Sequence, residues 1–129
     1  MIAFVEGKLV KKVEGSVVLK TAGGIGYEIF VPTGTLAALP MTGTEVLLHT
    51  YLQVKEDGVA LFGFLREEEK RVFQLLISVN GIGPKGALGI LSGTTIEDLQ
   101  FAVLAGDTKT IAKLPGIGPK TAGKLVLEL

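Results

Sequence analysis

The spacing of hydrophobic and polar positions changes near residue 65. Before that point, short runs rich in β-branched and aromatic residues alternate with Gly- and Pro-containing turns, which is typical of strands. Within Val46–Lys55, alternate positions are expected to form the buried face of a strand: Val46, Leu48, Thr50, Leu52 and Val54. The clearest predicted strands are Ser16–Lys20, Gly26–Val31, Glu45–Val54 and Val59–Phe64, with a short helix at Thr35–Leu39.

From Arg66 onward, apolar residues recur with helical spacing. One expected apolar stripe consists of Val72, Leu75, Leu76 and Val79. The sequence Thr94-Thr95-Ile96-Glu97 resembles a cap for a helix that runs to Ala105, where Gly106 would end it.

The fold class predicted from these patterns is a β barrel followed by an all-α domain. Residues 1–64 would form a small five-stranded barrel of the OB type, and an SH3-like barrel suits the pattern almost as well. Residues 65–129 would form the compact all-helical domain.

Composition narrows the classes of protein. Hydrophobic residues make up 47% of the chain and charged residues 20%, as in a globular protein, and there is no Cys for disulfides or the usual zinc sites. With no signal-like start and no long apolar run, we expect a soluble, cytoplasmic protein without a membrane partner. Thirteen basic and thirteen acidic residues cancel, which argues against nucleic acid, but Lys109, Lys113, Lys120 and Lys124 gather near the C-terminus.

An internal repeat carries the functional prediction. Leu76–Lys85 matches Ile111–Lys120 at an offset of 35 residues, and both segments contain Gly-Ile-Gly-Pro-Lys. The apolar positions before and after each turn stay in register, which predicts two helix-hairpin-helix motifs. A tight turn without function is a fair interpretation of one copy, but two copies in register favour a binding device.

The residue types of each repeat suit a phosphate. The first Gly is expected to end the incoming helix in a left-handed conformation, and the Ile to pack inward. The second Gly lets a phosphate approach, and Pro opens a helix whose free N–H groups and dipole attract an anion. Such a site grips the DNA backbone without reading sequence. The predicted backbone-binding residues are Asn80, Gly81, Ile82, Gly83, Lys85, Gly116, Ile117, Gly118, Lys120, Thr121 and Lys124.

Three other signals have simpler explanations. Gly23-Gly24-Ile25-Gly26 lies between predicted strands and reads as a hairpin turn rather than a nucleotide loop. The run Glu67-Glu68-Glu69 complements a helix dipole, and His49 has no second ligand nearby. We therefore expect no catalytic residue, no metal and no cofactor.

The order of segments closely resembles the RuvA family, the bacterial Holliday-junction-binding subunits of branch-migration complexes. The resemblance runs from Met1 to Leu129. The segments that carry it, besides the two hairpins, are Met1–Gly7, Gly23–Glu28, Val54–Phe64 and Ile90–Gly93. It implies an OB-fold barrel that assembles a homotetramer, with stacking of two tetramers open, and hairpins that hold the four arms of a four-way junction. It also implies an acidic pin at Glu56 and Asp57, which the residues alone would suggest is only a soluble turn.

The resemblance further implies partner proteins, and the sequence departs from the family at one position. Family members work in recombination and repair with an ATP-driven motor, RuvB, reached through a third helical domain that these residues do not include; ATP is used by the motor. The resolvase RuvC is a further expected partner. The family often has a basic residue where Pro119 stands, which would shift phosphate contact toward Lys120 and Lys124.

Two alternatives stay open on the sequence. In a helix-hairpin-helix DNA glycosylase, Lys120 would attack the sugar as a Schiff-base amine, but only Glu128 follows as a carboxylate. The other alternative is a protein whose barrel and helical bundle bind only other proteins.

Overall fold

The computed structural model describes all residues from 1 to 129, which fall into two units, Met1–Lys70 and Arg71–Leu129. The division falls inside helix α2 (Glu67–Ser78), a few residues after the boundary that the change of spacing suggested. The first turn of α2 belongs with the barrel, where the Lys70 Nζ donates a hydrogen bond to the Ala3 carbonyl at 3.3 Å.

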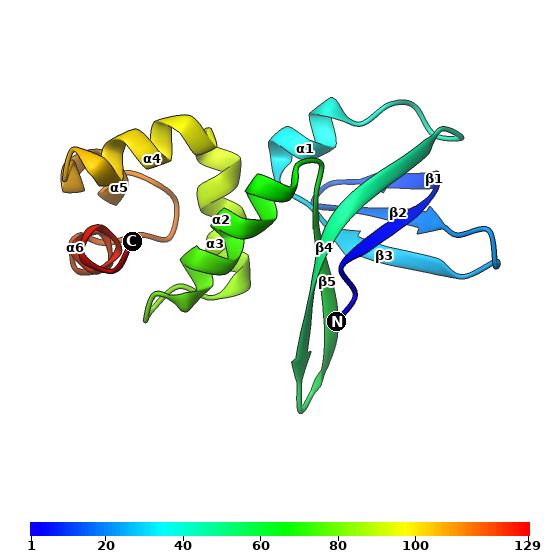
Figure 1. Cartoon of the computed structure of the whole chain (residues 1–129), viewed down its shortest axis with the longest axis horizontal. Helices are drawn as coiled ribbons and strands as arrows, with labels where there is room; N and C mark the ends of the chain where they lie inside the picture. Colours follow the sequence, from blue (N-terminus) through cyan, green and yellow to red (C-terminus); the bar gives the residue numbers. More distant parts are fainter. The chain divides into compact units, whose positions relative to one another are not determined.

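The first unit is a closed five-stranded barrel (Figure 1). Its strands lie in the order β1-β2-β3-β5-β4, with β3 and β5 parallel and the other pairs antiparallel. This OB-like architecture confirms the predicted fold class. The elements are β1 (Phe4–Val13), β2 (Ser16–Lys20), β3 (Gly26–Phe30), α1 (Thr33–Ala38), β4 (Glu45–Lys55) and β5 (Gly58–Phe64).

The barrel core follows from alternation along each strand. Leu9, Leu19, Ile29 and Leu48 are fully buried and belong to one cluster. Gly7 marks the closest approach of β1 to β2, because a Cβ atom there would lie 2.5 Å from the carbonyl oxygen of Lys20.

The predicted buried face of β4 is correct in the barrel and wrong at its end. Leu48 and Thr50 are buried, and the Thr50 hydroxyl donates to the Ile2 carbonyl at 2.6 Å. Val54 is 66% exposed, because β4 and β5 stay paired as far as Lys55 and Gly58, beyond the strands that could cover them. The hairpin thus projects from the barrel (Figure 1).

The second unit is all-helical. The predicted cap and stop are confirmed: the Thr95 side chain accepts from the Asp98 N–H at 3.1 Å, and Gly106 has a φ of 66° after α4. No helix combines the length and apolar character that crossing a bilayer requires. After α2, the helices of the second unit are α3 (Pro84–Gly93), α4 (Ile96–Leu104), α5 (Thr108–Ala112) and α6 (Pro119–Glu128).

Candidate functional site

The first Gly-Ile-Gly-Pro-Lys segment forms a β-turn between α2 and α3. The Ile82 N–H donates to the Val79 carbonyl at 3.1 Å, and Gly81 stands third in this turn with a φ of 98°. A positive φ at the third position is the requirement of a type II turn. The expectation that the first Gly ends the incoming helix is wrong here, because α2 already ends at Ser78 and Gly81 acts inside the turn.

The second segment repeats this geometry between α5 and α6. The Ile117 N–H donates to the Leu114 carbonyl at 3.2 Å, and Gly116 has a φ of 77°. Pro115 stands second in the turn, where its fixed φ suits type II. The left-handed glycines predicted from the sequence are therefore confirmed in both copies.

The side chains that anchor the two hairpins are also equivalent. At four pairs of positions 35 residues apart, both members are almost completely buried. The pairs are Leu76 (0% exposed) and Ile111 (0%), Ile82 (7%) and Ile117 (7%), Ala87 (0%) and Ala122 (0%), and Ile90 (1%) and Leu125 (0%). The sequence repeat is thus a structural repeat, and the two Ile side chains serve the packing of the hairpins.

Each outgoing helix begins in the same way. Gly83 and Gly118 are the N-caps, with φ of −93° and −94° and ψ of 176° in both, and neither uses a side-chain cap. The first helical hydrogen bonds run from the Ala87 N–H to Gly83 and from the Ala122 N–H to Gly118, both at 2.9 Å. The backbone N–H groups between these residues consequently remain available.

These available N–H groups are the hydrogen-bond donors of the candidate site. Pro contributes no N–H, so each helix presents those of its next two residues, Lys85 and Gly86 in α3 and Lys120 and Thr121 in α6. Both Lys side chains are exposed, as is Lys124 one turn later in α6. The arrangement can bind an anion through amides, the helix dipole and a cation together.

The two hairpins meet within the helical unit. A Cβ atom on Gly81 would lie 3.7 Å from the Thr121 Oγ1, so the start of α6 lies beside the first turn. At the other end of α3, a Cβ on Gly93 would lie 3.2 Å from the Pro115 Cδ of the second turn. Asn80 is exposed next to Gly81. This contact between the motifs could not be predicted from either repeat by itself.

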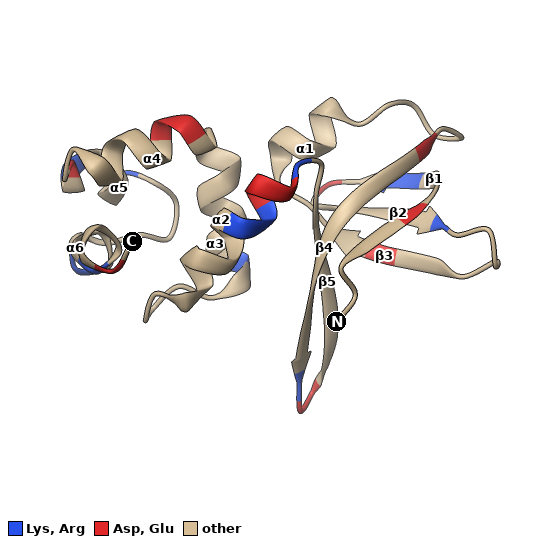
Figure 2. Ribbon diagram, viewed as in Figure 1, with Lys and Arg blue, Asp and Glu red and all other residues tan.

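The acidic residues Glu56 and Asp57 form the tip of the β4–β5 hairpin (Figure 2). They lie between the paired residues Lys55 and Gly58, and all four are exposed. Gly58 has a φ of 153°, a conformation that favours glycine at this turn.

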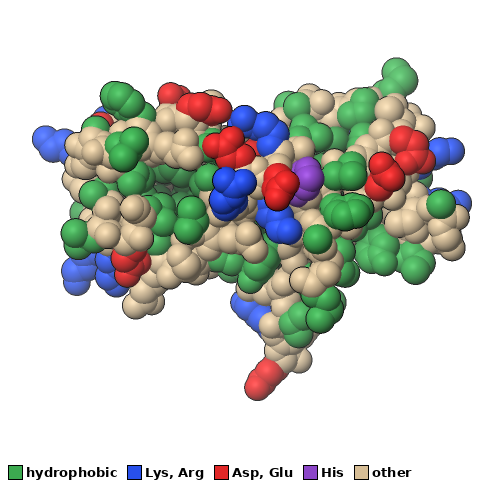
Figure 3. Space-filling view, in the orientation of Figure 1, with side chains coloured by type: hydrophobic (Ala, Val, Ile, Leu, Met, Phe, Trp, Pro, Cys, Tyr) green, Lys and Arg blue, Asp and Glu red, His purple; other side chains and the backbone are tan.

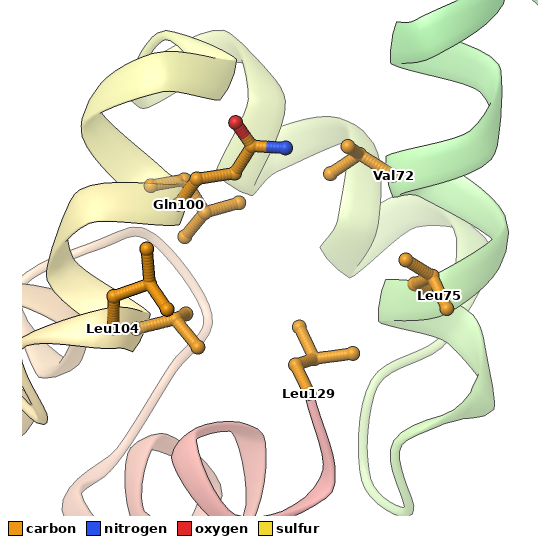
Figure 4. A pocket seen from close by; sticks show the side chains of 7 residues that line it. Val72, Leu75, Gln100, Leu104 and Leu129 are labelled. Atoms are coloured by element: carbon orange, nitrogen blue, oxygen red, sulfur yellow. The ribbon is translucent and has the colours of Figure 1, made fainter.

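An apolar groove of about 300 Å³ lies elsewhere in the helical unit (Figures 3 and 4). Leu75, predicted in the apolar stripe of α2, is 48% exposed and lines this groove, so the stripe is only partly buried. Gln100 is the one polar lining side chain, and a specific ligand site would need several convergent polar groups. No cluster of three or more His, Asp or Glu side chains is arranged to hold a metal ion. The lining residues are Val72, Leu75, Leu99, Gln100, Val103, Leu104 and Leu129.

The fold and the paired turns define a class of protein, an OB-like barrel followed by a tandem helix-hairpin-helix. Comparison with known families agrees: residues 1–63 match the RuvA N-terminal domain, and residues 73–129 match the SAM-like helix-hairpin-helix tandem. The chain belongs to the RuvA family.

Relatives match along the whole chain. Each of the following is a Holliday junction branch migration complex subunit RuvA: that of Lachnospira eligens is 51% identical, that of Syntrophotalea carbinolica 50%, and that of Thermoanaerobacter sp. 47%, each over all 129 residues. The chain spans 62%, 64% and 68% of their respective lengths. These relatives support the RuvA resemblance and give no support to the glycosylase alternative.

Proposed function

We propose that this protein binds four-way junction DNA and serves as the DNA-specificity subunit of a branch-migration complex. The observation that carries the proposal is the pair of equivalent turns, each followed by a helix with two available N–H groups and an exposed Lys. Two such devices in one unit suit the contact of one duplex arm at two backbone phosphates.

The binding mechanism follows from the local geometry. A phosphate oxygen at the start of α6 would accept from the N–H groups of Lys120 and Thr121, with the Lys120 ammonium beside it. Lys124, one turn along the same helix, would extend the contact to a neighbouring phosphate. At α3, the corresponding donors are those of Lys85 and Gly86. Since every nucleotide carries the same phosphate, binding would be independent of sequence and strongly weakened by salt.

Preference for a junction would come from the barrel unit. The carboxylates of Glu56 and Asp57 at the hairpin tip repel phosphates, which disfavours a continuous duplex at that point and favours a centre where strands separate. The tip is exposed at the end of two strands that stay paired as far as Lys55 and Gly58, so this repulsion would act at a defined position.

The wider assembly is also part of the proposal. Four arms require four copies, so we infer a homotetramer, and stacking of two tetramers remains compatible with it. The relatives are named as subunits of a complex, which supports a partner motor such as RuvB, with ATP used by the motor and RuvC as a further partner. The chain itself would have no catalytic role and need no cofactor. Since the protein would act on the bacterial chromosome, we expect it to be located in the cytoplasm.

The proposal is tested by measuring affinity for a four-way junction and for a linear duplex of equal length across a range of salt concentrations. We expect tighter binding to the junction at every salt concentration. Replacement of Glu56 and Asp57 by Gln and Asn should reduce the preference while leaving duplex affinity unchanged or higher. Equal affinities of the unaltered protein for the two DNAs would refute the proposal.

A further inference from the structure

Two valines stand exposed on the projecting hairpin, directly behind its acidic tip. Val54 in β4 and Val59 in β5 are paired across the strands and are 66% and 70% exposed. Paired residues lie on the same face of a hairpin, so the two side chains form one apolar surface. Hydrophobic side chains are visible on the hairpin between the barrel and the acidic tip (Figure 3).

This valine pair continues the inward-facing stripe of the barrel. Leu52 and Leu61 form the next pair on the same face, since side chains alternate along a strand, and Leu61 is 7% exposed. Within the barrel the stripe is core, whereas on the hairpin nothing in the chain covers it. Covering two valine side chains is favourable, and their pairing directly behind the tip places them where a molecule that meets the tip would contact them.

The acidic tip decides which part of a DNA molecule could contact these valines. Glu56 follows Val54 by two residues and Asp57 precedes Val59 by two, a separation of roughly 7 Å along each strand. Carboxylates at that distance repel phosphates, whereas a nucleobase is uncharged and has a flat apolar face. In other DNA complexes, apolar side chains insert between neighbouring bases and partly unstack them.

We propose that Val54 and Val59 form an apolar surface against which bases unstacked at the centre of a four-way junction are held. The proposal rests on the proposed function, because it requires the hairpin tip to enter the junction centre. It adds a separate role: the carboxylates would exclude the backbone, and the valine pair would stabilise the separated bases. A second copy of this chain is the competing occupant.

The test uses a junction with the fluorescent base 2-aminopurine at the branch point and protein at saturating concentration. Unaltered protein should raise the fluorescence, which reports unstacking. In the double variant Val54→Thr with Val59→Thr, Thr keeps the shape and strand preference of Val but adds a hydroxyl group. We expect the rise in fluorescence to fall by more than half and the preference for junction over duplex to fall about tenfold.

A matched control comes from β1, where Val10 and Val13 are 45% and 43% exposed on the same barrel. The corresponding pair of Thr replacements should leave both readouts unchanged. An unchanged fluorescence rise in the Val54 and Val59 variant would overturn the inference, and so would a lower molar mass by light scattering, which would assign the pair to a contact between copies. If the unaltered protein does not prefer the junction, the proposed function fails, and this inference fails with it.

Discussion

Gly116 and Gly118 lie two residues apart in the second turn, and we expect replacement of each by Ala to have a different effect: one on stability and the other on DNA binding. Gly116 has a φ of 77°, so an Ala there is strained even though its Cβ would meet no atom within 4 Å. We expect Gly116→Ala to lower the free energy of unfolding by about 1–2 kcal/mol. For a unit of this size, that corresponds to a fall in the melting temperature of roughly 4–15 °C.

Gly118 has an ordinary extended conformation, with φ −94° and ψ 176°, and a Cβ there would also meet no atom within 4 Å. Because Gly118 is the N-cap of α6, Gly118→Ala should change stability little: the gain of about 0.4–1 kcal/mol from a less flexible unfolded chain is offset by the poorer capping of Ala. The added methyl group would instead stand where a phosphate approaches the N–H groups of Lys120 and Thr121. Loss of such charge-assisted hydrogen bonds costs about 1.5–3 kcal/mol, which is a fall in DNA affinity of tenfold or more.

The two variants are compared by urea unfolding, followed by far-ultraviolet circular dichroism, and by fluorescence anisotropy with a labelled four-way junction. We expect Gly116→Ala to lose stability and Gly118→Ala to lose affinity. A Gly118→Ala protein that is destabilised as much as Gly116→Ala, or that binds DNA as tightly as the unaltered protein, would overturn these two roles.

Three further predictions concern single residues. Lys120→Ala should weaken binding to junction and duplex alike and reduce the slope of log K against log salt by about one, and an unchanged slope would count against phosphate contact. Gly7→Ala should destabilise the barrel by about 1–3 kcal/mol in urea unfolding, because its Cβ would lie 2.5 Å from the Lys20 carbonyl oxygen, and full stability would contradict the close approach of β1 and β2. The side-chain and backbone hydrogen bonds from Thr110 hold the pKa of the Asp107 carboxyl below its ordinary range, so their stabilising effect is present above the unfolded pKa and is lost as pH falls through the lower folded one. Asp107→Asn should consequently flatten the loss of helical stability below about pH 4, measured by circular dichroism.

The sequence predicted the repeat well because its signal is local. Positive φ at Gly81 and Gly116 and the inward packing of Ile82 and Ile117 depend on a few neighbouring residues, and the structure confirms them. The conformation around these glycines was less predictable. Whether Gly ends a helix or turns the chain three residues later depends on where α2 stops, which the sequence does not mark.

The exposure of Val54 and Leu75 has one physical cause. Alternation in a strand and periodicity in a helix show which residues share a face, but not whether another element covers that face. Val54 lies on the correct face of β4 beyond the end of the barrel, and Leu75 lies on the stripe of α2 beside a groove. The approach of Thr121 to Gly81 is likewise a tertiary contact between two motifs, so neither motif alone could reveal it.

The central claim is that DNA phosphates are bound by the available N–H groups at the starts of α3 and α6. Titration of the isotope-labelled protein with a short DNA duplex, followed through its amide resonances, observes those groups directly. We expect the largest chemical-shift changes on Lys85, Gly86, Lys120 and Thr121, and we expect added salt to reverse them. Larger changes at the apolar groove or on the barrel strands, with these four amides unaffected, would contradict this claim.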